Sequence, residues 1–154
     1  MMKNILKTTL LFTLLLLVGC GSKQPNPDAK YEQNLLYTKV GKVIQNNEVK
    51  MLLYVTYLNS AKKEKYSDIY QNFLVSVYSK NNIQLDSEKF KMNNRDLFYI
   101  KKIDKTSSLY KDIALRNSWS DYYIIKFYNT KKKYLNLDYF YDDKNIIKIR
   151  FKKE

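Results

Sequence analysis

Apolar side chains recur at every second position along most of this chain after its first thirty residues. Successive side chains of a β-strand point to opposite faces, so a period of two is typical of strands that bury one face. The clearest case is the last stretch, where three apolar residues alternate with three cations: Ile147, Ile149 and Phe151 with Lys148, Arg150 and Lys152. We therefore predict a mainly β protein whose last strand has one face in a core and the other in solvent.

Seven stretches carry this pattern over enough residues to form strands. They cover residues 37–44, 48–58, 69–80, 96–103, 122–129, 134–141 and 146–152, and a brief further strand is predicted at 83–85. Asparagine, which adopts positive φ more readily than other non-glycine residues, marks turns at 45–47 and 81–82. The last three stretches predict a three-stranded meander with turns at 130–133 and 142–145.

Two segments depart from the strand pattern. Residues 86–94 are expected to be irregular or to form a single helical turn. Residues 105–120 are the candidate helix, in which Ser107 or Ser108 would cap the start and Leu109 and Ile113 would share a face. At about eight residues, such a helix is marginal without tertiary contacts.

Seven strands in about 120 residues, with at most one or two short helices, predict an antiparallel two-sheet sandwich. In strand count alone the pattern resembles an immunoglobulin-like domain. The likeness goes no further, because the cysteine pair that joins the two sheets of antibody domains is missing. A small open β-barrel is the alternative architecture.

The first twenty residues follow a different pattern. Lys3 and Lys7 give a basic start, and an apolar run over residues 10–18 follows, broken only by Thr13. About 20 apolar residues are needed to span a hydrocarbon core, whereas a run of this length is typical of a signal-peptide core. We therefore interpret the segment as an export signal rather than a permanent membrane span.

The signal ends in Leu17, Val18, Gly19 and Cys20, which resemble the lipobox of bacterial lipoprotein signal peptides. The resemblance implies transfer of a diacylglyceryl group to the Cys20 thiol and cleavage between Gly19 and Cys20. The thiol is the nucleophile that accepts the lipid, and the small Gly19 leaves room at the scissile bond. Two acyl chains hold a protein firmly on a membrane, whereas one chain binds marginally. The competing interpretation is a plain signal peptide in which Cys20 is incidental.

The chain therefore divides into a signal peptide at 1–19, a lipidated tether at 20–30 and a single β domain at 31–154. The tether contains both prolines of the sequence and has no apolar period. The expected location is the bacterial cell envelope, with the lipid on Cys20 in the membrane. In a Gram-negative cell the outer membrane is favoured, because Gly21 is not the Asp that commonly signals inner-membrane retention.

The chain has 28 Lys and Arg against 15 Asp and Glu, a formal net charge of +13, which falls to +11 when Lys3 and Lys7 leave with the signal peptide. Such a surplus favours anionic partners such as lipid headgroups or acidic glycans. Nucleic acid is not an expected partner for an exported protein. Abundant Lys, Asn, Ile, Tyr and Phe are also what an AT-rich genome produces, so base composition is a competing explanation of the charge.

Missing residue types exclude several chemistries. The chain has no histidine, and Cys20 is its single cysteine. Zinc sites built on His or Cys, Ser-His-Asp triads, Cys-His dyads and disulfides are therefore excluded. No glycine-rich phosphate loop is present either, so the sequence predicts no cofactor, no metal site and no catalytic residue.

Two groups of residues are candidates for binding. Lys148, Arg150 and Lys152, joined by Lys126 or by residues 131–133, could form a basic sheet face for acidic glycans or lipid headgroups. The competing interpretation is a solvated face whose charges discourage edge-to-edge pairing of strands.

Trp119, Tyr122 and Tyr123 could form an aromatic patch for sugars or peptides. The competing interpretation, which we favour, is that these rings are buried where a connection enters a strand, with their polar ends hydrogen-bonded.

Three carboxylates, Asp138, Asp142 and Asp143, could act as an acid–base pair or as calcium ligands. No calcium-loop motif follows them, and Asp142 and Asp143 stand where a hairpin turn favours Asp. We interpret these two as turn residues.

These observations predict a non-enzymatic envelope lipoprotein that binds or scaffolds an envelope protein or an anionic polymer. A second hypothesis is an envelope hydrolase that uses Asp and Glu alone. A third is a surface-exposed coat protein without a specific ligand.

Overall fold

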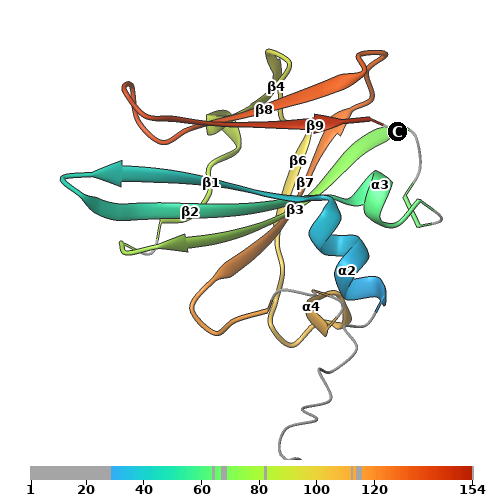
Figure 1. The fold of residues 1–154 in the computed structure, drawn as a ribbon, viewed down its shortest axis with the longest axis horizontal. Coiled ribbons are helices and arrows are strands. Elements are labelled where there is room, and N and C mark those ends of the chain that lie inside the picture. Colours follow the sequence, from blue (N-terminus) through green and yellow to red (C-terminus); the bar gives the residue numbers. More distant parts are fainter. Residues whose placement is uncertain are drawn as a thin grey trace, which may run out of the picture.

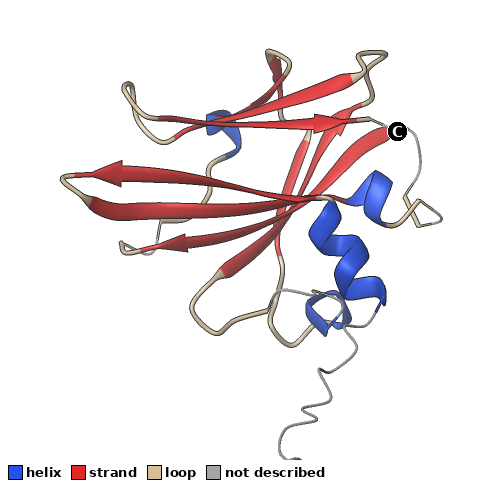
Figure 2. Ribbon diagram, in the orientation of Figure 1, coloured by secondary structure: helices blue, strands red, loops and turns tan. Residues whose placement is uncertain are grey.

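The computed structural model describes residues 29–63, 65–66, 69–81, 83–111, 113 and 116–153. The predicted signal peptide, its motif Leu17, Val18 and Gly19, the lipidation site Cys20 and the tether up to residue 28 lie outside these residues. Where it is described, the chain is built almost entirely of strands, with a few short helices (Figures 1 and 2). None of the described helices is long and apolar enough to cross a bilayer.

The described strands form two antiparallel sheets, which confirms the predicted sandwich class. The large sheet has the order β1-β2-β3-β7-β6 and the small sheet the order β5-β4-β8-β9. The strands are β1 (Thr38–Gln45), β2 (Glu48–Tyr57), β3 (Tyr70–Ser79), β4 (Phe90–Met92), β5 (Arg95–Asp96), β6 (Tyr99–Lys102), β7 (Asp121–Tyr128), β8 (Tyr134–Phe140) and β9 (Ile146–Lys152).

The described α-helices lie beside the large sheet, whereas the 3-10 turn lies against the small sheet. They are α2 (Ala29–Leu36), α3 (Leu58–Ala61), α4 (Ser108–Lys111) and the 3-10 turn η1 (Ser87–Lys89). Figure 1 shows α2 and α4 on one side of the large sheet and the small sheet on the other. The small sheet therefore covers one face of the large sheet, and the opposite face carries helices and the connection that contains α4.

The core lies between the sheets and consists of the alternate residues that the period of two predicts. Met51, Leu53, Val55 and Tyr57 on β2 are at most 2% exposed. They belong to one cluster with residues of the facing sheet: Leu135, Leu137, Tyr139, Ile147, Ile149 and Phe151. On β9 the three apolar residues are buried and the three cations are exposed, as the sequence predicts. Burial of this apolar surface, at about 25 cal/mol per Å², is the main force that holds the sheets together.

The two sheets approach each other most closely where β1 lies along β9 (Figure 1). Gly41 on β1 is the glycine at this contact. A Cβ atom at Gly41 would lie 2.1 Å from Cγ2 of Ile147 and 3.3 Å from Cδ1 of Ile149. Only a residue without a side chain lets the β1 backbone pack directly onto the side chains of β9.

Pairs of asparagines form two hairpin turns. Asn46 (φ 53°) and Asn47 (φ 59°) join β1 to β2, and Asn93 (φ 51°) and Asn94 (φ 67°) join β4 to β5. Two consecutive residues with positive φ make the tight turn whose twist matches that of a hairpin. The first turn was predicted. The second was missed, because its strands have only 3 and 2 residues and leave no visible period.

The predicted C-terminal meander is wrong. β8 and β9 form the expected hairpin, but β7 pairs with β3 and β6 in the large sheet. The connection at 129–133 therefore carries the chain from one sheet to the other. The reason is burial on both faces: β7 lies between two strands and under helical cover, so it is a central strand rather than an edge of the small sheet.

The predicted strand at 96–103 is also wrong, because it is two strands in different sheets. β5 ends at Asp96 in the small sheet, β6 begins at Tyr99 in the large sheet, and Leu97 and Phe98 cross between them. Residues 83–85 form no strand, and Leu85 instead closes the core at 5% exposure. Residues 86–94, predicted to be irregular or one helical turn, contain η1 and β4.

The helices differ from the prediction in position and length. α2 begins inside the predicted tether, and the Thr38 hydroxyl donates a hydrogen bond of 2.6 Å to the carbonyl of Asn34 at its end. α4 is shorter than expected and is capped by Ser107, whose hydroxyl accepts from the Tyr110 N–H at 3.3 Å. Because α4 ends at Lys111, it does not bring the Leu109 and Ile113 side chains onto one helical face.

The close packing of β1 on β9 predicts the effect of Gly41→Ala. The added Cβ overlaps Ile147, so the free energy of unfolding should fall by about 1–3 kcal/mol, the usual cost of overpacking. Urea unfolding followed by circular dichroism measures it. Ile147→Ala removes the overlapping methyl, so Gly41→Ala should cost less in that background. Equal losses in both backgrounds would contradict the overlap.

The positive φ of Asn47 predicts opposite results for two small substitutions. Asn47→Ala should lower the free energy of unfolding by about 1 kcal/mol, because a Cβ without a compensating side-chain amide is disfavoured in this region. Asn47→Gly, the matched control, should keep or raise stability. Thermal unfolding compares the two variants, and equal melting temperatures would contradict the turn geometry.

Candidate functional site

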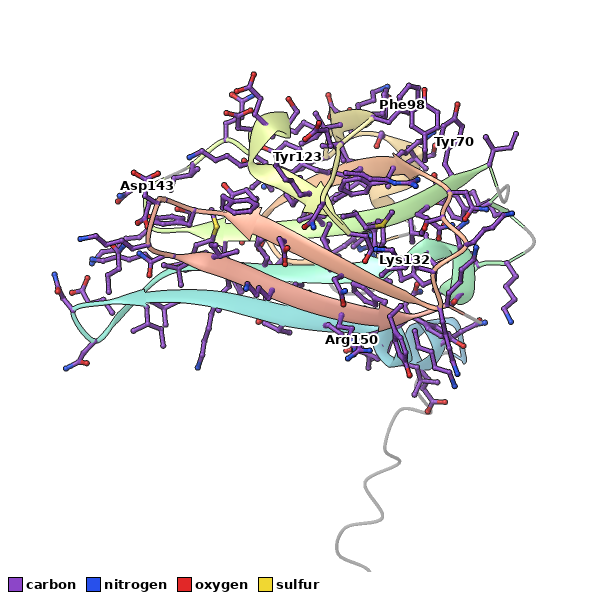
Figure 3. All side chains as sticks on the ribbon, turned by 90° about the horizontal axis from the view of Figure 1, so that it is seen from above. Tyr70, Phe98, Tyr123, Lys132, Asp143 and Arg150 are labelled. Atoms are coloured by element: carbon purple, nitrogen blue, oxygen red, sulfur yellow. The ribbon has the colours of Figure 1, made fainter. Side chains whose placement is uncertain are left out.

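Four aromatic side chains gather where β3 and β6 begin and β7 ends. They are Tyr70, Phe98, Tyr99 and Tyr128, and we call them the aromatic plate; Figure 3 labels Tyr70 and Phe98, which lie side by side. Phe98, Tyr99 and Tyr128 are 47%, 39% and 54% exposed, while Tyr70 is half-buried. Rings of this size normally contribute to a core, so a cluster that presents open ring surface is a candidate binding site.

Contacts among the rings fix their orientation. Tyr70 and Phe98 are stacked, with planes 5° apart and centroids separated by 5.1 Å. Tyr128 packs at a tilt against both, with its centroid 4.6 Å from that of Phe98 and 5.7 Å from that of Tyr70. A ligand would therefore meet a preformed surface and would not have to order mobile side chains, which lowers the cost of binding.

Lys126 adds one positive charge to the aromatic plate. The register of β7 places it between Asn72 on β3 and Tyr99 on β6. Its Nζ atom lies 5.1 Å from the ring centroid of Tyr99 and 5.9 Å from that of Tyr70. The negative ring faces attract the ammonium group and keep it beside the plate. The site thus combines flat apolar surface with a cation, which suits a ligand that has an apolar ring face and an anionic group.

A polar network supports the strand ends that carry the plate. The Tyr57 hydroxyl donates to Oε1 of Gln71, and Nε2 of Gln71 donates to Oδ1 of Asn129. Gln71 directly follows Tyr70, and Asn129 directly follows Tyr128. Because Gln71 is 1% exposed, the network is fixed in the core and holds the backbones of both tyrosines in place.

Sequence reasoning missed this site. Tyr70, Phe98 and Tyr128 lie 28 and 30 positions apart along the chain and were each assigned to a separate strand. The available signal was an apolar residue near the end of each strand, at a position that alternation assigns to the outward face. Whether these residues meet in one site depends on which strands pair. The pairing of β3 with β7 places Tyr70 opposite Tyr128.

The predicted basic face is divided between the two sheets. Lys148, Arg150 and Lys152 are exposed on the outer face of β9, whereas Lys126 lies on β7 in the large sheet. The residues were grouped because β7 was expected to pair in one meander with β8 and β9. Since β7 pairs with β3 and β6 instead, Lys126 belongs to the aromatic plate.

The outer face of the small sheet carries alternating charges rather than a uniform positive field. Lys148 stands opposite Asp138, Asp138 opposite Lys91, and Lys91 opposite Asp96. The Lys91 ammonium lies 3.2 Å from Oδ1 of Asp96. Opposite charges on neighbouring strands stabilise sheet pairing, so this row is explained by the sheet itself.

The cations near the end of β9 gather around Tyr134. The guanidinium carbon of Arg150 lies 3.9 Å from the Tyr134 ring centroid, and Nζ of Lys133 lies 5.9 Å from it. Register places Lys152 opposite Tyr134. Figure 3 shows Lys132 and Arg150 on the small-sheet side of the molecule, apart from Tyr70 and Phe98.

The predicted aromatic patch of Trp119, Tyr122 and Tyr123 is not assembled. Tyr122 and Tyr123 are 0% and 2% exposed and point to opposite faces of β7, as neighbours in a strand must. Tyr123 lies in the core between the sheets, and Tyr122 lies in a second apolar cluster on the helical side. The predicted burial is confirmed for both tyrosines, but only the Tyr122 hydroxyl is hydrogen-bonded, whereas the buried Tyr123 hydroxyl has no partner among the described residues. The prediction was wrong for Trp119, which is 70% exposed.

Asp142 is a turn residue, as predicted. Its carboxylate accepts hydrogen bonds from the Asn145 side chain at 2.8 Å, from the Lys144 N–H at 2.9 Å and from Nε2 of Gln45 at 3.0 Å. The bond from the Asn145 side chain, followed by that from the Lys144 backbone, lowers the pKa of Asp142. Asp143 lies in the same turn. No group of three or more acidic, His or Cys residues among those the structure describes could hold a metal ion.

One cavity of about 20 Å³ lies on the helical side of the large sheet. Its apolar lining comes mainly from Leu58, Leu74, Ile103, Leu109, Ile113 and Ile124. A volume of this size holds about one water molecule, whereas small-molecule sites occupy hundreds of Å³. The aromatic plate is therefore the stronger candidate for ligand binding.

The polar network below the aromatic plate predicts a stability difference between two substitutions on β3. Gln71→Leu removes hydrogen bonds to Tyr57 and Asn129 and should lower the free energy of unfolding by about 1–3 kcal/mol. Ser76→Ala is the matched control, because the buried Ser76 hydroxyl has no hydrogen-bond partner and its removal should cost nothing. Urea unfolding measures both, and equal effects would argue against the network.

Comparisons of this chain with protein-family models, with curated proteins and with solved structures find no match. What the site can bind is therefore inferred from the chemistry of the aromatic plate and of Lys126.

Proposed function

We propose that this chain is a bacterial lipoprotein, anchored through Cys20, whose β-sandwich binds an anionic polysaccharide of the cell envelope without catalysing a reaction. The anchor is supported by the lipobox-like sequence that ends in Cys20. The binding function is supported by a single observation, the preformed aromatic plate with Lys126 beside it.

The plate matches the chemistry of an acidic sugar. A pyranose ring has a face of C–H groups that packs on an aromatic ring, and a carboxylate or phosphate on the sugar would pair with the Lys126 ammonium. The plate is an open surface formed by strand ends, so it accommodates a segment of a long chain rather than a small enclosed molecule. The surplus of Lys and Arg adds a general attraction for a polyanion that weakens as salt rises.

Two other functions have less support. Hydrolysis by carboxylates would require two facing Asp or Glu side chains, one with its pKa raised by burial. Hydrogen bonds from neighbouring groups instead lower the pKa of Glu48, Asp104 and Asp142, all on the surface. A coat protein without a ligand would have no need of open, mutually packed rings.

The aromatic plate predicts that Tyr128→Ala weakens binding to an acidic polysaccharide, with polygalacturonate as the probe, by about tenfold, which corresponds to about 1.4 kcal/mol. Lys126→Gln should weaken binding to polygalacturonate more than to neutral dextran, because only the former offers a carboxylate. Affinity electrophoresis of the folded variants measures both effects.

The matched controls for this experiment lie outside the plate. Trp119→Ala removes an exposed ring at the other end of β7, and Lys148→Gln removes a cation from the small sheet. Both should bind polygalacturonate as the wild type does. If Tyr128→Ala also binds like the wild type, or if no acidic polysaccharide binds, the proposed ligand class is wrong.

The anchor predicts that Cys20→Ala abolishes metabolic labelling with a fatty acid and leaves the precursor uncleaved. The reason is that the thiol is the group that accepts the lipid. Ser22→Ala, two residues later, should be labelled and processed like the wild type. Persistent labelling of Cys20→Ala would end the lipoprotein assignment.

A further inference from the structure

The connection from β7 to β8 leads away from the aromatic plate, over the end of the sandwich. It covers residues 129–133 and joins Tyr128, the last residue of β7 in the large sheet, to Tyr134, the first residue of β8 in the small sheet. Residues 131–133 are three consecutive lysines, all exposed, and we call them the lysine row. The lysine row carries three positive charges from the plate toward the small sheet.

Hydrogen bonds fix the backbone of this connection. The Lys153 ammonium donates to Oδ1 of Asn129 at 2.8 Å and to the carbonyl of Thr130 at 3.1 Å. The Lys153 N–H donates to the carbonyl of Lys133 at 2.8 Å, and the Lys132 N–H donates to the Thr130 hydroxyl at 3.3 Å. Because Thr130 is buried, these bonds attach the connection to the body of the domain. The place of the lysine row beside the plate is therefore set by the fold.

Among the described residues, no carboxylate forms an ion pair with the lysine row or with Lys126. The stretch 122–137 contains these four lysines and no acidic residue. Like charges that are held close together repel one another, and an anionic ligand relieves this repulsion. The lysine row is therefore suited to a ligand that brings several negative charges.

The lysine row ends at a second exposed ring. Tyr134 is 38% exposed, and the guanidinium carbon of Arg150 lies 3.9 Å from its ring centroid. Nζ of Lys133 lies 5.9 Å from the same centroid. Figure 3 shows Lys132 between Tyr70, which belongs to the plate, and Arg150, which packs on Tyr134. This end of the sandwich thus repeats the combination found at the plate, an aromatic ring with cations beside it.

The spacing of the two ring surfaces suits a polymer rather than a small saccharide. Tyr128 and Tyr134 lie on the outer faces of two sheets, and packed sheets are about 10 Å apart. The two tyrosines are six residues apart, so their Cα atoms are separated by at most about 22 Å. A short saccharide covers one ring surface, whereas a longer chain reaches both across the lysine row.

We propose that the binding surface continues from the aromatic plate along the lysine row to Tyr134 and holds an extended segment of the polymer. The inference rests on the proposed function and specifies its ligand. The rings support C–H faces of sugar units, and the lysines between them pair with acidic groups. Several cations in a row match a polymer that carries acidic groups on successive units, and such a polymer binds through its interior rather than through one chain end.

The length of the saccharide tests this surface. Lys131→Gln combined with Lys132→Gln should weaken binding of polygalacturonate about fivefold, because exposed ion pairs are individually weak. Binding of the galacturonate dimer, which covers only the plate, should stay unchanged. Nuclear magnetic resonance titration of the folded variant measures both ligands. Lys144→Gln combined with Lys148→Gln, the matched control, removes the same charge near the other end of β9 and should bind both ligands as the wild type does.

The outcomes separate this inference from the proposed function. Equal polymer affinity of the test and control variants would overturn the role of the lysine row. A fivefold loss of dimer affinity would also overturn it, because the lysines would then belong to the plate alone. If the wild type binds neither ligand, the proposed function itself is wrong.

A tryptophan at the end of the lysine row tests whether the polymer reaches Tyr134. Trp119→Phe combined with Tyr134→Trp leaves a single tryptophan there, and Trp119→Phe combined with Phe140→Trp is the control at the other end of β8. Polygalacturonate should shift the fluorescence emission of the first variant and not that of the second, and the dimer should shift neither. Bound polymer that leaves the emission of the first variant unchanged would overturn the continuation to Tyr134 and leave the plate intact.

Discussion

The apolar core between the two sheets is the interaction on which the rest of this structure depends. The single cysteine excludes a disulfide, so burial of alternate strand residues must hold the sheets together. The contact of β1 with β9 shows how closely this burial is matched to backbone shape, because Gly41 packs directly onto Ile147. The core also determines the pairing of β7, which needs cover on both faces and receives it only inside the large sheet.

The position of β7 links the fold to the proposed function. Its last residue, Tyr128, belongs to the aromatic plate, Lys126 supplies the cation of that site, and Trp119 stands just before its first residue. A strand buried on both faces is among the most rigid elements of a domain. Tyr128 and Lys126 are therefore held in fixed positions for binding by the strand that carries them.

The positive charge of the chain is a weaker guide to function than its total suggests. Part of it lies on the small sheet, where Lys148 faces Asp138 across the strands and Arg150 stacks on Tyr134. Through these contacts the cations stabilise the surface of the small sheet. Lys126 differs because it stands beside exposed rings on the other sheet, where it can meet an anionic group together with an apolar surface. The location of a cation beside a binding surface, rather than the total positive charge of the chain, therefore indicates a role in recognition.

The sequence by itself determined which side chains enter the core, the β class, the first hairpin at Asn46 and the last hairpin of β8 and β9, because each depends on neighbours within a few residues. It also contains the lipobox-like motif, which is recognised from consecutive residues and does not depend on the fold. Only the tertiary structure decided which strands pair, since every half-buried strand offers the same backbone hydrogen bonds to any neighbour. For that reason Lys126 was grouped with the wrong strands, and the proximity of Tyr70, Phe98 and Tyr128 could not be foreseen. The strands pair in the arrangement that buries the most apolar surface in the whole core. That surface comes from all strands together, so no single stretch of sequence predicts the pairing.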